Sequence, residues 1–158
     1  HDVAAARPGL AVDWLAEEAF TALPAMCGEV RRTVPLALRR WRRSPLARAT
    51  WREFRAFRAT LREERYDAVL DLQEQVKGGV IARIAIGTRH GFDRSSIREP
   101  VATIFDDVHH AVPRDLHFAT RCRRLAGAAL GYAVRPLDVS EFVKAEAALT
   151  CKSLLFRA

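Results

Sequence analysis

Residues 66–71 read Tyr-Asp-Ala-Val-Leu-Asp, a short apolar run between charged residues that predicts a buried strand. The chain continues with Leu72-Gln73, and a helical pattern then begins at Val76. A strand followed by a helix is half of a βαβ unit, and the rest of the chain repeats this alternation. We therefore predict an α/β fold with a Rossmann-like, mainly parallel sheet.

Outward from this strand, short extended runs alternate with amphipathic runs in both directions. The expected extended segments are residues 10–15, 30–35, 90–92 and 110–112. Helices are expected at the very start of the chain and over residues 20–26, 45–65, 76–87 and 115–130. Ser44 is the expected N-cap of the helix over 45–65, Gly87 lies near the expected end of the next helix, and Gly131 closes the last. From Ser140 the pattern fits a helix with Phe142, Ala145, Leu149 and Phe156 on one face.

Composition sets limits on the class of protein. The 158 residues, 49% hydrophobic and 28% charged, suit one domain or half of a two-domain protein and can bury a core. No apolar run approaches the ~20 residues of a membrane span, and no secretory signal is visible. The three cysteines, Cys27, Cys122 and Cys151, are far apart, which predicts free thiols and a cytoplasmic location.

Positive charge is concentrated in one stretch. The chain carries a net charge of +7, whereas residues 31–65 alone hold twelve arginines against three glutamates, a local balance of +9. Such a concentration predicts an acidic ligand, a nucleic acid or an anionic membrane surface as partner.

The sharpest local feature is the string Arg39-Arg40-Trp41-Arg42-Arg43. Guanidinium groups bind phosphate and carboxylate through paired hydrogen bonds, so these four arginines are the predicted anion site. Trp41 would either stack on a sugar or anchor the loop. The alternative is a solvated basic loop without a ligand.

Ligands of open α/β sheets bind beyond the carboxyl ends of the strands. That rule also selects Glu17 and Glu18, as a base, as hydroxyl ligands or as a helix start, and Asp71 with Gln73. His90, His109, His110 and His117 lack the spacing of a metal-binding helix, so we expect no metal site. No nucleophile or phosphate-loop motif is present in the sequence.

Several strings together resemble the ADP-heptose:lipopolysaccharide heptosyltransferases, in particular those of type I. The resemblance spans Pro8 to Tyr132, and it is carried by VDWLAEEAF at 12–20, ALRRWRR at 37–43, YDAVLDLQ at 66–73, RHGFDRSSIREP at 89–100 and HAVPR at 110–114. The arginine string around Trp41 and the string ending in Arg98-Glu99-Pro100 are the specific parts.

The resemblance implies a GT-B glycosyltransferase in lipopolysaccharide core synthesis. Such an enzyme has two Rossmann-like domains, transfers heptose with inversion, and needs no metal or other cofactor. The amino-terminal domain would bind Kdo-lipid A and the carboxyl-terminal one ADP-heptose, on the cytoplasmic face of the anionic inner membrane. The resemblance implies a set of residues that bind the acceptor: Arg39, Arg40, Arg42, Arg43, Asp71, Gln73, Lys77 and Arg98.

The same resemblance predicts what the chain lacks. The family's first strand and its Ser-Leu-Gly-Asp turn, with the expected catalytic base, would lie upstream of His1, and the donor domain beyond Ala158. We therefore expect no catalytic residue here, an acceptor domain over 1–139 with a central gap in its sheet, and a separate tail over 140–158. Glu74 stands where the family has glycine, which would disturb that turn.

Two other functions fit the basic composition. A nucleic-acid-binding module could use the arginines of residues 46–65, although Phe54 and Phe57 fall on the apolar stripe and could not stack on bases. A degenerate structural remnant is the other alternative. We expect no nucleic acid as partner.

Overall fold

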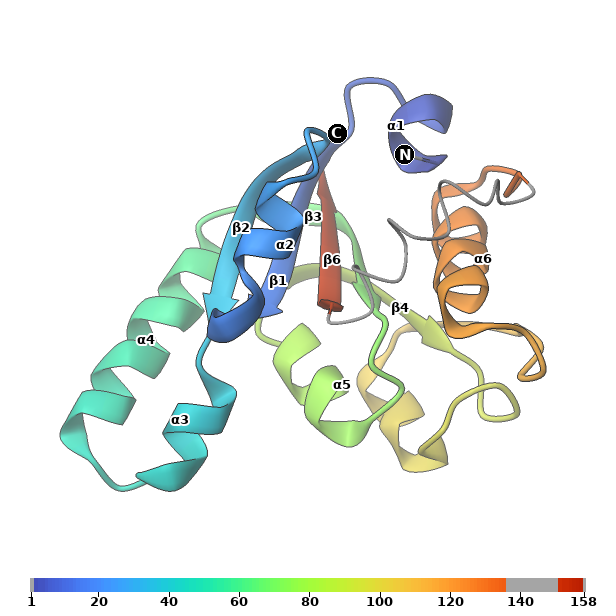
Figure 1. Ribbon diagram of the computed structural model, residues 1–158. Coiled ribbons are helices and arrows are strands. Elements are labelled where there is room, and N and C mark those ends of the chain that lie inside the picture. The colour runs from blue at the N-terminus through green and yellow to red at the C-terminus, as the bar shows by residue number, and fades with distance from the viewer. Residues whose placement is uncertain (1, 136–150, 158) are drawn as a thin grey trace.

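The computed structural model, which describes residues 2–135 and 151–157, is an α/β fold built on one six-stranded sheet (Figure 1). The strand order is β2-β1-β6-β3-β4-β5. Among the strands that the structure describes, five run parallel to one another, and β6 runs antiparallel to its neighbours β1 and β3. The predicted fold class is thus confirmed, with one antiparallel strand in the centre.

The strands are β1 (Ala11–Glu17), β2 (Val30–Leu36), β3 (Arg65–Asp71), β4 (Ile86–Phe92), β5 (Val108–His110) and β6 (Cys151–Arg157). The α-helices are α1 (Asp2–Ala6), α2 (Ala22–Ala25), α3 (Leu38–Arg43), α4 (Arg48–Arg62), α5 (Val76–Ala82) and α6 (Phe118–Leu130). Two 3₁₀ helices, η1 (Glu18–Phe20) and η2 (Pro100–Phe105), complete the described elements.

Strand β6 fills the position where we expected a central gap. Leu155 pairs with Asp13 of β1 on one side and with Val69 of β3 on the other. Leu155 and Phe156 are both fully buried and point to opposite faces, as successive residues of a strand do. The end of the chain therefore joins the two halves of the sheet.

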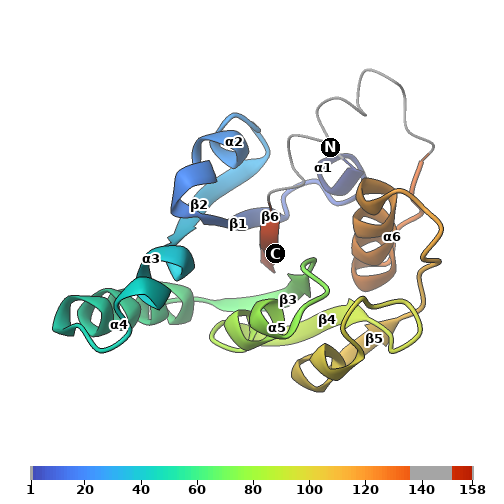
Figure 2. The same ribbon diagram turned by 60° about the horizontal axis from the view of Figure 1, so that its bottom comes forward.

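Each face of the sheet carries its own apolar core. One core combines strand residues with Trp41, Phe57, Leu61 and Ile81, which lie on α3, α4 and α5. The other combines strand residues with Leu125 and Ala126 of α6 and with Ala102 of η2. Figure 2 shows α3, α4 and α5 on one side of the sheet and α1 and α6 on the other.

Three expectations about local structure were wrong. Ser44 does not cap α4; its amide donates to the Trp41 carbonyl (3.2 Å) and ends α3, so α4 begins only at Arg48. Gly87 does not end α5; it lies in β4, where a Cβ would collide with the Tyr66 carbonyl. Residues 151–157 form a strand rather than a helix, because Leu155 and Phe156 find apolar cores on both faces of the sheet.

The remaining residues of the expected tail helix, Phe142, Ala145 and Leu149, lie outside the described residues. Gly131 does close α6, as predicted, with a left-handed φ of 70°. None of the helices in the described part of the chain has the length and apolar character to cross a lipid bilayer.

Candidate functional site

The predicted arginine string forms the short helix α3 directly after β2, at the carboxyl edge of the sheet (Figure 1). Trp41 is buried and packs edge-on against Phe54 and Phe57, with ring centroids 5.7 and 5.5 Å apart. It therefore anchors the helix to α4, and its ring is not offered to a sugar. The four arginines around it are exposed.

These arginines fall into two groups by their contacts. Arg40 is tied down by Glu18 (3.0 Å) and Glu53 (2.6 Å). The guanidinium group of Arg39 lies over the ring of Phe20, 5.8 Å from its centroid. By contrast, no side-chain hydrogen bond, ion pair or ring contact links Arg42 or Arg43 to any other residue that the structure describes. These two are the charges that remain available to a ligand.

Glu17 and Glu18 serve this helix and do not face a crevice as reactive groups. Glu17 is 1% exposed and its carboxylate accepts a hydrogen bond from the amide of Arg39 (3.0 Å) at the start of α3. Glu18 pairs with Arg40. Both carboxylates thus hold α3 in place, which is the structural alternative to a general base.

A second group of arginines surrounds a pocket of about 490 Å³ at the end of β3. Gln73 and Arg98, both predicted from sequence, line it together with Leu72, Glu74, Gln75, Arg114, Phe118 and Arg121. Arg98 and Arg114 are exposed at its rim. Arg121, from the first turn of α6, is 7% exposed.

Glu74 keeps the turn after Gln73 although it is not glycine. Its φ of 58° lies in the left-handed region, where a side chain is strained. Its carboxylate is buried and forms an ion pair with Arg121. Glu74 thus adopts a backbone conformation that suits glycine, and its side chain brings a negative charge into the pocket.

Asp71 is buried beneath this turn. Its Oδ1 accepts the amide of Gln73 (2.9 Å), and a side chain at Gly78 would collide with it. Burial, together with the nearby charges of Asp106 and Glu74, raises the pKa of Asp71 to about 7. Asp71 therefore shapes the loop from within, whereas Lys77, on α5, is exposed.

Both arginine groups lie at the carboxyl ends of the parallel strands, but they are well separated from each other. The α3 group follows β2 and the pocket follows β3, and β1 and β6 lie between these strands. Three strand spacings put the strand ends roughly 14 Å apart. The structure therefore does not join all the predicted residues in one crevice; it separates them into two groups of arginines.

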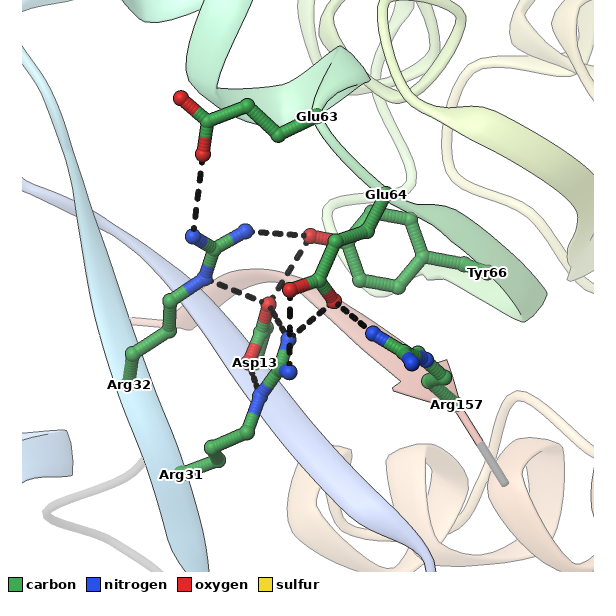
Figure 3. Close-up of polar contacts among 7 residues, drawn as sticks. All are labelled: Asp13, Arg31, Arg32, Glu63, Glu64, Tyr66 and Arg157. Atoms are coloured by element: carbon green, nitrogen blue, oxygen red, sulfur yellow. Dashed lines mark hydrogen bonds and ion pairs between the residues drawn. The ribbon is translucent and has the colours of Figure 1, made fainter.

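A separate ionic cluster, which we call the Asp13 cluster, lies at the other end of the parallel strands, near their amino ends (Figure 3). Asp13 is completely buried, and its carboxylate accepts hydrogen bonds from Arg31 (2.8 and 2.7 Å), Arg32 (2.7 Å) and Tyr66 (2.9 Å). The carboxylate of Glu64 forms ion pairs with Arg31 and Arg157. Because Arg157 belongs to β6, this strand is also tied to the cluster. At the amino ends of the strands this cluster is a structural tie, away from the ligand edge.

Two histidines from neighbouring strands stack on each other. His90 Nδ1 and His110 Nε2 are 3.0 Å apart, and burial lowers the pKa of both rings. Among the residues described, no three His, Cys, Asp or Glu side chains are placed so as to hold a metal ion. Cys27 and Cys122 are free thiols.

A mostly parallel sheet with helices on both faces, and with charged groups gathered at the carboxyl ends of its strands, is typical of the Rossmann-like class of α/β domains. Residues 54–153 match the model of Glycosyltransferase family 9 (heptosyltransferase). The chain belongs to this family.

The chain is 37% identical over 150 residues to lipopolysaccharide heptosyltransferase 1 of Escherichia coli K12, covering 94% of the chain and 47% of that protein. The same protein of Pseudomonas aeruginosa is 37% identical over 142 residues, or 89% of the chain and 40% of that protein. The solved E. coli heptosyltransferase WaaC with ADP superposes with a TM-score of 0.84 at 36% identity, covering 94% of the chain and 47% of that structure. The chain thus spans about half the length of these relatives, which give no support to the nucleic-acid alternative.

Sequence reasoning missed Arg114 and Arg121 as pocket residues. Arg114 has no signal beyond its place in the string HAVPR, and Arg121 is one of several arginines on α6. A usable signal was present, because Arg98 follows β4 and both Arg114 and Arg121 follow β5, and these two strands are neighbours in the sheet. Only the folded chain shows that Arg121 turns inward over Phe92, 4.7 Å from the ring centroid.

Proposed function

We propose that this chain is the acceptor-binding part of a heptosyltransferase of lipopolysaccharide core synthesis. The heptose would come from ADP-heptose held by a carboxyl-terminal domain, and the acceptor would be Kdo-lipid A. Transfer would proceed with inversion and without a metal or other cofactor. Family membership supports the reaction class, and the two arginine groups on the ligand edge support an acceptor with more than one acidic group.

The observation that carries the acceptor assignment is the pair Arg42 and Arg43. Charge-assisted hydrogen bonds to phosphate or carboxylate are the strong ones, and a guanidinium group without an internal partner can form them at no loss to the fold. Arg40, in contrast, would have to give up Glu18 and Glu53. Arg42 and Arg43 therefore belong to the ligand, and Arg40 to the helix.

This division gives a sharp binding test. A soluble, deacylated Kdo-lipid A should raise the melting temperature of the unmodified chain. The double variant Arg42→Ala/Arg43→Ala should lose most of this rise while melting at the same temperature without ligand. Arg55→Ala/Arg58→Ala, which removes the same charge from exposed positions on α4, should retain it. A saturating acceptor that shifts nothing, or equal losses in both variants, would refute the assignment.

We also propose that the α3–α4 corner lies on the cytoplasmic face of the inner membrane. Leu46 is 90% exposed and Trp51 53% exposed, and Arg42, Arg43, Arg48 and Arg52 are exposed nearby in the sequence. Apolar side chains among arginines suit an anionic bilayer, where each basic residue contributes about 1 kcal/mol.

Vesicle sedimentation tests this location. The chain should bind vesicles with anionic lipid and release them at high salt, and Leu46→Ala/Trp51→Ala should bind less. Val101→Ala/Ile104→Ala, an equally apolar and exposed pair on η2, is the matched control. Equal binding by both double variants, or binding to neutral vesicles alone, would contradict the proposed orientation.

A further inference from the structure

A pair of histidines joins the edge strand β5 to the rest of the sheet. Strand β5 is three residues long, lies at one end of the strand order of the described sheet, and pairs with β4. His90 Nδ1 on β4 and His110 Nε2 on β5 are 3.0 Å apart, and the two ring planes are nearly parallel, at 17°. At this distance the two nitrogens share one hydrogen atom, which one ring donates and the other accepts.

The histidine contact tolerates one extra proton but not two. A neutral imidazole has one donor and one acceptor nitrogen, whereas both nitrogens of an imidazolium are donors. If one ring is charged, the other still accepts, so the hydrogen bond survives. If both rings are charged, two N–H groups and two positive charges meet at 3.0 Å, and the contact has to open.

Mostly basic groups surround the histidine pair. His90 lies two positions before Phe92 on the same strand and therefore on the same face of the sheet, the face that α6 covers. Helix α6 contains no acidic residue. The basic and imidazole groups on α6, β4 and β5 are Arg89, His109, Arg121, Arg123 and Arg124. A second charge on the pair would thus meet further positive charge.

The acidic residues of this region are engaged elsewhere or lie on the other face. Asp107 pairs with Arg89, and the carboxylate of Asp93 accepts hydrogen bonds within its own turn. Two buried carboxyl groups lie on the α5 side of the sheet, where a Cβ at Gly78 or Gly91 would collide with them: Asp71 and Asp106. Burial, followed in each case by the nearest other histidine, lowers the pKa of both rings of the pair.

A chain of hydrogen bonds connects β5 to α6. The carbonyl of His110 accepts the amide of Asp93 (2.9 Å). Two residues beyond His110, the amide of Val112 donates to Ser96 Oγ (2.8 Å), and the carbonyl of Ser96 accepts from Arg121 (2.6 Å). The position of Arg121 therefore depends on where β5 holds the backbone that follows it.

We propose that His90 and His110 form a proton-sensitive latch, which holds β5 and the Ser96–Arg121 contact in place until both rings are charged. β5 can separate from β4 without opening an apolar core, because none of its three residues belongs to one. Both folded pKa values lie below the unfolded value of 6.5, so the latch is fully stabilising above pH 6.5 and is lost as pH falls through the folded values. The latch involves no ligand and does not rest on the proposed function.

Amide hydrogen exchange in the full chain tests the latch, with protection factors measured from about pH 7.5 to about pH 5. The amides of Asp93 and Val112 report on β5 and the loop beyond it, and the amide of Val69, inside β3, reports on global unfolding. Protection of the first two should fall by up to about tenfold per pH unit below the unfolded pKa, because opening takes up one proton. Val69 should remain protected. Constant protection of Asp93 and Val112 would overturn the latch.

Two substitutions remove the charge and keep the contact. In His90→Asn and His110→Gln, a side-chain amide that does not titrate takes the position of Nδ1 or Nε2. The double variant should show protection of Asp93 and Val112 that no longer depends on pH, and an unchanged pH dependence would contradict the latch. His109→Gln, the same change at the adjacent exposed ring, should keep the pH dependence of the unmodified chain.

Asp106 needs its own control, because its pKa of about 6 falls in the same pH range. Asp106→Asn should keep the loss of protection in acid; if the loss disappeared, the carboxyl group and not the histidine pair would be the switch. The Nε–H resonance of Arg121 should move over the same pH range in the unmodified chain and stay in place in the double histidine variant. A resonance that stays in place in the unmodified chain while β5 opens would overturn the coupling to α6.

Discussion

The indole Nε1 of Trp41 donates a hydrogen bond to the carboxylate of Glu53, 2.9 Å away, and so connects α3 to α4. Arg40 donates to the same oxygen atom (2.6 Å). The two donors, with the indole the stronger influence, hold the pKa of Glu53 below its usual value. Trp41 therefore attaches α3 to α4, and the arginine side chains of α3 that have no partner remain exposed to solvent.

Replacing Trp41 should lower the free energy of unfolding by an amount that depends on how much of the side chain is removed. Trp41→Phe retains an aromatic ring against Phe54 and Phe57 but loses the donor, and should lower the free energy of unfolding by about 1.5 kcal/mol. Trp41→Ala also loses the packing and should cost about 3–5 kcal/mol. Urea unfolding measures both. Trp51→Phe, at a mostly exposed position, should change little, and an equal effect there would rule out the hydrogen bond as the cause.

Stability should fall as pH rises from about 4 to about 7. Burial raises the pKa of Asp71 to about 7 and that of Asp106 to about 6, both from 3.8. A carboxyl group with a raised pKa stabilises the fold fully below its unfolded pKa, and this contribution disappears as pH rises through the folded value. For Asp71 the loss is on the order of 4 kcal/mol. Urea unfolding from pH 4 to pH 8 measures this fall.

Asp71→Asn provides the control, because an amide does not titrate. It should flatten most of the pH dependence and raise stability at pH 8. A variant with the same pH slope as the unmodified chain would show that other groups cause it. Asp106→Asn should remove the smaller part of the pH dependence of stability, near pH 6. Both carboxylate oxygens of Asp106 are buried and lack hydrogen-bond partners among the described residues.

The Asp13 cluster should respond to pH in the opposite direction. Burial alone would raise the pKa of Asp13, but hydrogen bonds from Arg31, Arg32 and Tyr66 outweigh it and lower the pKa. Its contribution is therefore present above the unfolded value of 3.8 and is lost as pH falls through the lower folded value.

Asp13→Asn should cost about 3 kcal/mol at neutral pH, a modest figure for a buried ion pair because both guanidinium groups are partly exposed. Guanidinium chloride would screen the ionic contacts, so urea is the denaturant to use. The difference between variant and parent should shrink in strong acid. A constant difference at every pH would show that packing rather than charge carries the effect.

Sequence alone predicted the fold class because each parallel strand carries its own local signal. The strand over residues 66–71 and the helix closed by Gly131 are examples where apolar spacing and a left-handed glycine suffice. The α3 arginines were found the same way, from charge density after a strand. Their separation into Arg40, paired, and Arg42 with Arg43, unpaired, depends on where Glu18 and Glu53 fold, which no local pattern contains.

Strand β6 could not be predicted because its signal is entirely long-range. The spacing of Phe156 from the apolar residues before it also fits a helix, so the local pattern predicts a helix over residues 151–157. These residues form a strand because they pair with β1 and β3. Even β3, the nearer of the two in sequence, lies more than 80 positions earlier in the chain. The same holds for Arg121, whose inward turn depends on Phe92 and Ser96.

The sheet depends on β6, because this strand pairs with β1 on one side and with β3 on the other. Leu155→Pro removes the backbone N–H of a strand that pairs on both sides, and proline is not tolerated in the middle of a sheet. It should abolish cooperative unfolding and expose the edges of β1 and β3, which then associate between molecules. Phe156→Ala retains the backbone and should cost about 3–5 kcal/mol through packing alone, with no more light scattering than the unmodified chain. Light scattering with urea unfolding separates the two results, and Leu46→Ala at a 90% exposed position is the neutral control. If Leu155→Pro scattered no more light than the unmodified chain and unfolded cooperatively, the two halves of the sheet would have to hold together without this strand.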